Sequence, residues 1–167
     1  CLNFAGCYGL SRNARRLIHT SDCKYVLLPG EEVPAHFPHQ AASGSLTINL
    51  TPRPLPSSLR FKACILLSKF RDDILLMGGV SCHVMGKHNG FTVQYGSNQH
   101  HMPCKYKGYA DHLYIFEDSF CLNQDCPEAE EATFSELSFV FRLHDEDVKI
   151  KGCGVQLLEV PNCVTDE

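Results

Sequence analysis

The sequence contains no tryptophan, only three methionines, and no apolar run that approaches the roughly 20 residues of a membrane-spanning helix. The sequence also lacks a large excess of charge of one sign. It has 15 Lys and Arg and 19 Asp and Glu, which give a formal net charge of −4. This balance disfavours a broad basic face for nucleic acid. No signal peptide opens the chain. Since its first residue is Cys1 rather than Met, we expect a piece of a longer protein or a processed product.

What is present indicates one folded domain. The chain has 167 residues, of which 44% are hydrophobic and 20% are charged, as in ordinary globular proteins. A body of this size buries roughly 70% of its unfolded surface, so it can form a core without disulfides or metal. Disorder is therefore excluded for the bulk of the chain.

Ten cysteines bear on the cellular compartment. They make up about 6% of the chain, below the level of disulfide-rich scaffolds. Several of them, such as Cys64 and Cys82, lie inside apolar runs, where a free thiol behaves as a small hydrophobe. The sequon at Asn49 points to secretion instead, but Pro52 follows it directly. We therefore expect a reducing compartment and mostly free thiols.

One short helix is expected near the start of the chain. Leu10, Ala14, Leu17 and Ile18 follow a helical period, and Ser11 is a candidate N-cap. The arginines between them are expected to form a solvated face: Arg12, Arg15 and Arg16.

The remainder of the chain has the pattern of short strands with Gly and Pro between them. Candidate strands cover residues 24–28, 45–50, 61–70, 79–85, 91–95, 112–116, 134–143, 148–150 and 155–160. The Pro-rich stretch 52–56 is expected to end the second of these strands. Eight or nine strands with one helix predict an all-β fold, an antiparallel β-sandwich of jelly-roll or Ig-like type.

Long stretches between the strands are candidates for binding, because recognition residues concentrate on loops of a rigid scaffold. They are 96–109, the acidic 117–133, and 144–147. Residues 71–78 and the turn 87–90 are further candidates.

Tests for catalytic chemistry give negative expectations. His100, His101 and Cys104, with Cys121 and Cys126, fit zinc-ligand spacing poorly, so we expect no metal. No signature of a nucleophile or of a phosphate-binding loop is present, so no catalytic residue and no cofactor is expected. His112, at the start of an apolar strand, is expected to be structural, satisfied by a neighbouring backbone group. The residues alone therefore indicate a binding module.

A string of motifs resembles one family. The run Leu27-Leu28-Pro29-Gly30-Glu31-Glu32-Val33-Pro34, followed by Phe37, resembles the opening signature of the C-terminal jelly-roll/Ig-like domain of plant TIR-type nucleotide-binding leucine-rich-repeat immune receptors. Further matches follow in order: Gly44–Ile48, Phe61–Cys64, Val80–Cys82, Asp111-His112-Leu113-Tyr114 and Lys151–Leu158. The segment from Leu2 to Cys7 resembles the exit from a last leucine-rich repeat. The string is most similar to receptors for downy-mildew oomycetes, although His36 stands where the family often has tryptophan.

This resemblance implies a division of the chain and a function. Residues 1–20 would be the end of the repeats with a linking helix, and 21–167 the C-terminal domain. In the full receptor the repeats and this domain bind a pathogen effector, the receptor oligomerises, and its TIR domain cleaves NAD to start the hypersensitive response. The chain itself would recognise the effector in the cytoplasm or nucleus, together with the preceding repeats, without cofactor, enzymatic activity, nucleic acid or membrane. Alone, it would be a monomer.

A carbohydrate-binding, lectin-like module remains the alternative, although tryptophan, the usual platform for a sugar ring, is absent. For effector contact we expect the segments 71–78, 87–90 and above all 95–109, because aromatic and cationic residues dominate binding hot spots. The residues concerned are Arg71, Lys87, His88, Tyr95, His100, His101, Lys105, Tyr106 and Tyr109. The alternative for these residues is a solvated surface without contact.

Overall fold

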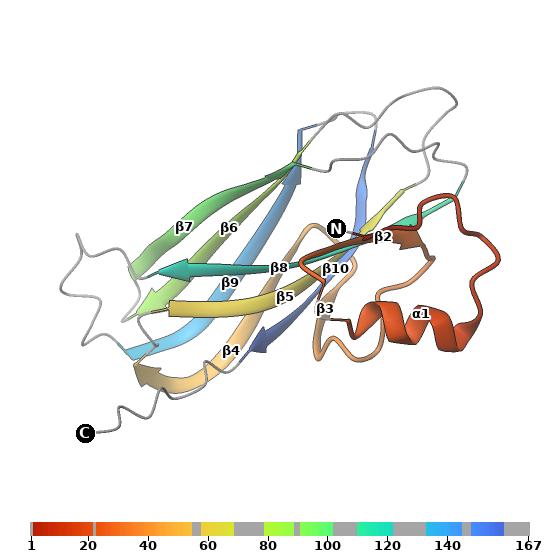
Figure 1. The fold of residues 1–167 in the computed structure, drawn as a ribbon. Helices are drawn as coiled ribbons and strands as arrows, with labels where there is room; N and C mark the ends of the chain where they lie inside the picture. Colours follow the sequence, from red (N-terminus) through yellow and green to blue (C-terminus); the bar gives the residue numbers. More distant parts are fainter. Residues whose placement is uncertain are drawn as a thin grey trace, which may run out of the picture.

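The computed structural model describes residues 2–21, 23–54, 58–68, 79–88, 91–101, 110–121, 133–144 and 148–158. These residues form two sheets, mostly antiparallel, that face each other, with one short helix beside them (Figure 1). The first sheet has six strands in the order β1 (Leu2–Asn3), β2 (Tyr25–Pro29), β8 (His112–Cys121), β5 (Ser58–Leu67), β10 (Ile150–Leu158) and β3 (His39–Ala41). The second has β4 (Ser45–Pro54), β9 (Thr133–Leu143), β6 (Gly79–His88) and β7 (Phe91–His101). The predicted all-β sandwich is confirmed.

The strand boundaries differ from the sequence-based expectation at several points. Strand β8 runs to Cys121, so residues 117–121 of the predicted acidic stretch 117–133 belong to a strand rather than to a loop. The described residues contain ten strands, because the short edge strands β1 and β3 carry no alternating pattern of their own. The segments 148–150 and 155–160 are not two strands, since 150–158 pairs continuously with β5 apart from one irregularity at its start. Strand β4 does not stop at Pro52 but continues to Pro54, with a register shift against β9 after Asn49. Proline is tolerated here because β4 is an edge strand.

The inner faces of the two sheets enclose an aromatic core. Phe61 of β5 stacks on Phe120 at 5.6 Å between ring centroids and meets Phe139 of β9 edge-on at 5.0 Å. Phe116 and Phe141 repeat the edge-on contact between the sheets at 6.1 Å. Each fully buried phenylalanine contributes about 1.5 to 3 kcal/mol of transfer free energy, so this core is the main support of the sandwich.

The outer face of the six-stranded sheet is also buried. Val26, Leu28, Cys64, Leu66, Leu113 and Ile115 form a second apolar cluster with Phe37. It is covered by the N-terminal segment and the 33–37 turn through Leu2, Phe4, Leu10, Ile18, Cys23 and Val33. Burial on both sides explains why 63–67 is a continuous apolar run. The first twenty residues are thus packed on the sheet; the domain boundary at residue 20 stays a prediction.

Helix α1 (Arg12–His19) confirms the predicted cap but only part of the predicted faces. The Ala14 amide donates to Ser11 Oγ at 3.2 Å, so Ser11 is the N-cap. Ile18 packs on the outer cluster, whereas Leu17 is 68% exposed and does not belong to the buried stripe. Arg15 is not simply solvated, because its guanidinium donates to the carbonyls of Leu10 and Pro29 at 3.2 and 2.9 Å.

The described cysteines are free. Cys82 and Cys153 fill the inner core, Cys64 fills the outer cluster, Cys23 is half-buried and Cys7 is exposed. The described part of the chain contains no helix that is long and apolar enough to cross a membrane.

Gly154 marks a close approach between the sheet and its cover. A Cβ atom at this position would lie 2.6 Å from Val33 Cγ1 and 2.9 Å from Phe37 Cβ. We therefore expect Gly154→Ala to lower the free energy of unfolding by about 1 to 3 kcal/mol through overpacking. Urea denaturation measures the change, and Gly9→Ala is the matched control, because nothing lies within 4 Å of its added Cβ. Equal stability of the two variants would contradict the packing described here.

Candidate recognition site

The structure describes the side chains of only some of the predicted contact residues. Lys87 lies in β6 with an exposed side chain, and its Nζ is 3.6 Å from Glu136 Oε1 of β9. His88, Tyr95 and His101 lie in the strands β6 and β7, but their side chains fall outside the described part. Arg71, Lys105, Tyr106 and Tyr109 lie outside the described residues. Effector contact by this set stays a prediction.

Strand β7 is longer than the sequence indicates. Residues 96–101, expected to open a long loop, pair with β6 from Val84 to Gly79. Their Gly, Ser, Asn and Gln composition resembles a loop, but these residues pair with β6 along one side of an edge strand. The connection between β7 and β8 therefore consists of residues 102–111.

The β7 end of this connection is fixed to the opposite sheet. His100 is only 7% exposed, and its Nε2 lies 2.8 Å from Asp118 Oδ2 of β8. The side-chain amide of Asn98 donates to both oxygens of Asp118, at 3.0 and 3.1 Å. The His100 ring packs on Phe116 at 4.4 Å. His100 thus links the two sheets, and its ring is not available as a surface group.

The β8 end is fixed by the Asp-His-Leu motif. His112 is fully buried, with Nδ1 2.8 Å from the Ala110 carbonyl oxygen and Nε2 2.9 Å from that of Ala5. This confirms the structural role predicted for His112. Asp111 accepts a hydrogen bond from the Gly30 amide with its backbone oxygen at 3.0 Å, and its carboxylate pairs with Lys151. The connection therefore returns to a point that is held by β2, β10 and the N-terminal segment.

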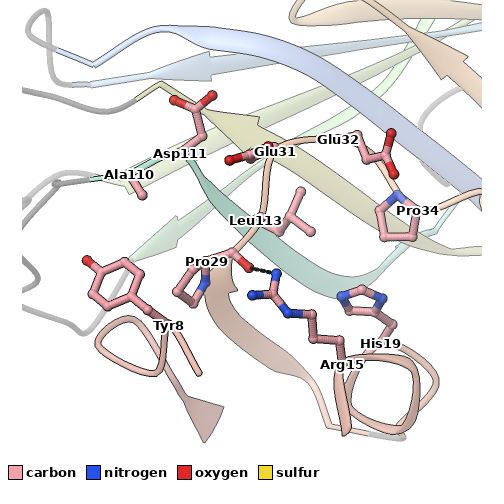
Figure 2. A pocket seen from close by; sticks show the side chains of 11 residues that line it. Tyr8, Arg15, His19, Pro29, Glu31, Glu32, Pro34, Ala110, Asp111 and Leu113 are labelled. Atoms are coloured by element: carbon pink, nitrogen blue, oxygen red, sulfur yellow. Dashed lines mark hydrogen bonds between the residues drawn. The ribbon is translucent and has the colours of Figure 1, made fainter. Parts of the chain in front are cut away.

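A cavity of about 760 Å³ lies beside this second anchor, between α1, the turn after β2 and the start of β8. Figure 2 shows Arg15 and His19 on the helix side, with Asp111 and Ala110 across the cavity beyond Leu113. Three carboxylates, those of Glu31, Glu32 and Asp111, line it with the Arg15 guanidinium. Sequence reasoning missed this cavity. The only signal was the pair of acids after Pro29-Gly30, which we noted only as part of the run that resembles the family signature.

Metal binding and thiol chemistry can be judged from the described side chains. They include no group of three or more His, Cys, Asp or Glu residues that could hold a metal ion. Burial raises the pKa of Cys64 and Cys82, and it raises that of Cys153 to about 11. A thiol acts as a nucleophile when its pKa is lowered, so these cysteines are structural. The arrangement is suited to binding.

Comparison with known proteins agrees with the resemblance noted in the sequence. The profile of the C-JID domain matches residues 28–162. The disease resistance-like protein DSC2 of Arabidopsis thaliana is 40% identical over 99% of this chain, which corresponds to 16% of DSC2. The probable disease resistance protein RPP1 of the same plant is 36% identical over 92% of the chain and 12% of its own length. The chain thus spans less than a fifth of these curated relatives.

A solved structure of a carbohydrate-binding module specific for non-crystalline cellulose, CBM28, covers 70% of this chain and 65% of its own. Its TM-score is 0.45 and its sequence identity 9%, too low to bear on function.

Removing the His112 ring should detach both the N-terminal segment and the base of the 102–111 connection. His112→Leu leaves the Ala5 and Ala110 carbonyls without this partner, and we expect a loss of about 2 kcal/mol or more in unfolding free energy. Urea denaturation measures the loss, and limited proteolysis should show faster cleavage near residues 5–10. His144→Ala, at an exposed position, should stay within about 0.5 kcal/mol of the parent protein. Equal effects of the two changes would show that His112 is not an anchor.

The raised thiol pKa values predict a pattern of alkylation. At about pH 8, a thiol with a pKa near 11 is ionised to about one part in a thousand, so Cys153 should not react in the folded chain, and neither should Cys64 or Cys82. Exposed Cys7 should react with iodoacetamide within minutes. Peptide mass spectrometry separates the sites, and the same reaction in concentrated guanidinium chloride should label all four. Labelling of Cys64 before Cys7 in the folded protein would contradict the burial.

Proposed function

Because the chain belongs to the C-JID domain family, whose members include parts of plant disease resistance proteins, we propose that it recognises a pathogen effector protein within a plant immune receptor. The contact segments in this proposal are 71–78, 87–90 and 95–109, acting together with preceding leucine-rich repeats. One structural observation carries the proposal. The connection 102–111 leaves one sheet at the buried His100–Asp118 pair and enters the other at His112, so both of its ends are fixed.

Fixed ends favour binding because less motion has to be lost when a partner is bound. The anchors at His100 and His112 are buried, and their rings are hydrogen-bonded to Asp118 of β8 and to the Ala5 carbonyl of the N-terminal segment, so they hold their positions without a ligand. Between them the sequence carries Lys105, Tyr106 and Tyr109, residue types that are enriched in binding hot spots. In this proposal His100 positions the segment, and the tyrosines and lysine make the contact.

The cavity beside Asp111 extends the same surface. Its carboxylates lie next to the C-terminal end of the segment and could accept hydrogen bonds from a basic side chain of the partner. The proposal thus combines cationic and aromatic groups on the segment with acidic groups at its base. Such mixed chemistry contributes specificity more than affinity.

The wider activity follows from the same proposal. The domain acts in the cytoplasm or nucleus, needs no cofactor and has no catalytic step of its own. In the full receptor, effector binding here and on the repeats leads to oligomerisation, after which the TIR domain cleaves NAD.

Tyrosine truncation in the 102–111 connection is the sharpest test. Tyr106→Ala or Tyr109→Ala should weaken binding of the matched effector by about 2 kcal/mol, some thirtyfold, without lowering thermal stability. Isothermal titration and a melting curve of the same samples measure both quantities, after pull-downs with candidate effectors have identified the match, with and without the repeats.

Leu17→Ala is the matched control, because this large side chain is exposed on α1, away from the proposed surface. It should leave affinity unchanged. If both tyrosine variants and Lys105→Ala bind within about twofold of the parent chain, the effector is recognised elsewhere and the proposal is wrong.

A further inference from the structure

A second cavity lies where the C-terminal end of α1 faces β5. Its volume is about 590 Å³, and its wall includes His19, His36, Arg60, Lys62 and Glu117. It shares His19 with the cavity of Figure 2, but its other lining residues include side chains of β5, β8 and β10. None of the predicted effector-contact residues lines this cavity.

At the end of α1, the carbonyls of Arg16 and Ile18 are occupied by hydrogen-bond donors from the residues that follow the helix. The amide and hydroxyl of Thr20 both donate to the Arg16 carbonyl, at 3.1 and 3.0 Å, and those of Ser21 donate to that of Ile18, at 3.2 and 2.7 Å. Lys62 Nζ donates to the Ser21 carbonyl at 2.8 Å. Free carbonyls at a helix C-terminus repel anions, so their occupation removes an obstacle to an anionic ligand.

The groups around this end are cationic or become so on protonation. The His19 and His36 rings lie 5.9 Å apart between centroids. Burial, followed by the neighbouring His36, Arg15 and Lys62, lowers the pKa of His19 to about 4. Burial, followed by Lys62, also lowers the pKa of His36. Every charged neighbour among these causes is a cation or an imidazole.

The one carboxylate in the cavity wall is already engaged. Glu117 of β8 lies opposite Lys62 in the register, but its Oε1 pairs with Arg60 of β5. Lys62 forms no ion pair within the described residues, and its ammonium group has two further protons after the bond to Ser21. Neither Lys62 nor the two histidines therefore has an anionic partner among the described residues.

One ring atom is also left unsatisfied. Nε2 of His19 is buried and has no hydrogen-bond partner within the described part of the chain. Such an atom costs about 1 to 3 kcal/mol relative to the hydrated state. An acceptor oxygen that reaches this atom would remove the cost, and a negative charge in the cavity would stabilise the protonated ring.

We propose that this cavity binds the oxyanion group, phosphate or carboxylate, of a small molecule, with His19, His36 and Lys62 as donors. The volume exceeds that of a single phosphate ion, so the ligand has a larger body, which Leu157 and Leu158 at the rim would contact. This site includes none of the predicted effector-contact residues, so each proposal can fail without the other.

Imidazole NMR of the 167-residue chain tests the proposal directly. The probe is inorganic phosphate, titrated at constant ionic strength near pH 6, with sodium acetate as a parallel arm. We expect saturable shifts of the His19 and His36 ring nitrogens with a dissociation constant of about 1 mM or tighter. The pKa of His19 should rise by about one unit, because an anion that binds the protonated ring tenfold more tightly shifts it by that amount. His39 and His144, outside the cavity, should not respond.

Variants distinguish phosphate binding in this cavity from nonspecific attraction to the positive charge of the helix. Lys62→Gln and His36→Gln should each weaken phosphate binding at least fivefold. His36 is on the exposed turn, so its variant folds even if the Lys62 variant does not. Arg16→Gln removes an exposed charge from the same helix outside the cavity wall and should change affinity less than twofold.

Saturation by acetate alone would assign the site to carboxylates, and saturation by phosphate alone to phosphates. Shifts that are linear in both arms, or an Arg16 variant as weak as the other two, would overturn the proposal.

Discussion

The six-stranded sheet buries apolar side chains on both of its faces, and most of the structure follows from this requirement. A sheet with one solvent-exposed face would need no covering layer beyond the sandwich core. Here Val26, Leu28, Leu113 and Ile115 point away from that core and must be covered. The N-terminal segment with α1 and the 33–37 turn provide the cover. The family signature around Pro29-Gly30 and Phe37 is therefore the signature of this second layer.

The same cover connects the scaffold to the candidate surfaces. His112 fixes the Ala5 carbonyl with one ring nitrogen and the Ala110 carbonyl with the other, so a single side chain joins the N-terminal segment to the base of the 102–111 connection. Arg15 attaches α1 to the Pro29 carbonyl, and Lys62 of β5 attaches the carbonyl of Ser21, just after the helix. Both cavities lie at these attachments, because a short helix laid over a twisted sheet leaves space where the two surfaces diverge.

The sequence pattern was sufficient to predict the structure where neighbouring residues alone determine it. Ser11 caps α1 as its position predicts, and residues 45–49 alternate exposed and buried as a half-buried strand should. It was insufficient where distant partners decide. Pro52 does not end β4, because β4 is an edge strand and no further strand needs a hydrogen bond from an amide at this position. Residues 96–101 extend β7 because they pair with β6. Leu17 follows the helical period, but α1 docks through Ile18 and Arg15 and leaves it in water. The cavities could not be predicted, since Arg15, His36, Lys62 and Asp111 come from four separate parts of the chain.

The two anchored ends of the 102–111 connection have a consequence for how such a domain can diverge. Among the described residues, His100 is held by Asp118 and Phe116, and His112 by Ala5 and Ala110. Between fixed ends, doubling the length of a connection costs only about 0.6 kcal/mol of closure entropy. Substitutions and insertions there are therefore nearly neutral for folding, whereas the strands beneath them, packed on two sides, tolerate few. A lineage carrying this fold can explore new surfaces rapidly while its scaffold stays unchanged.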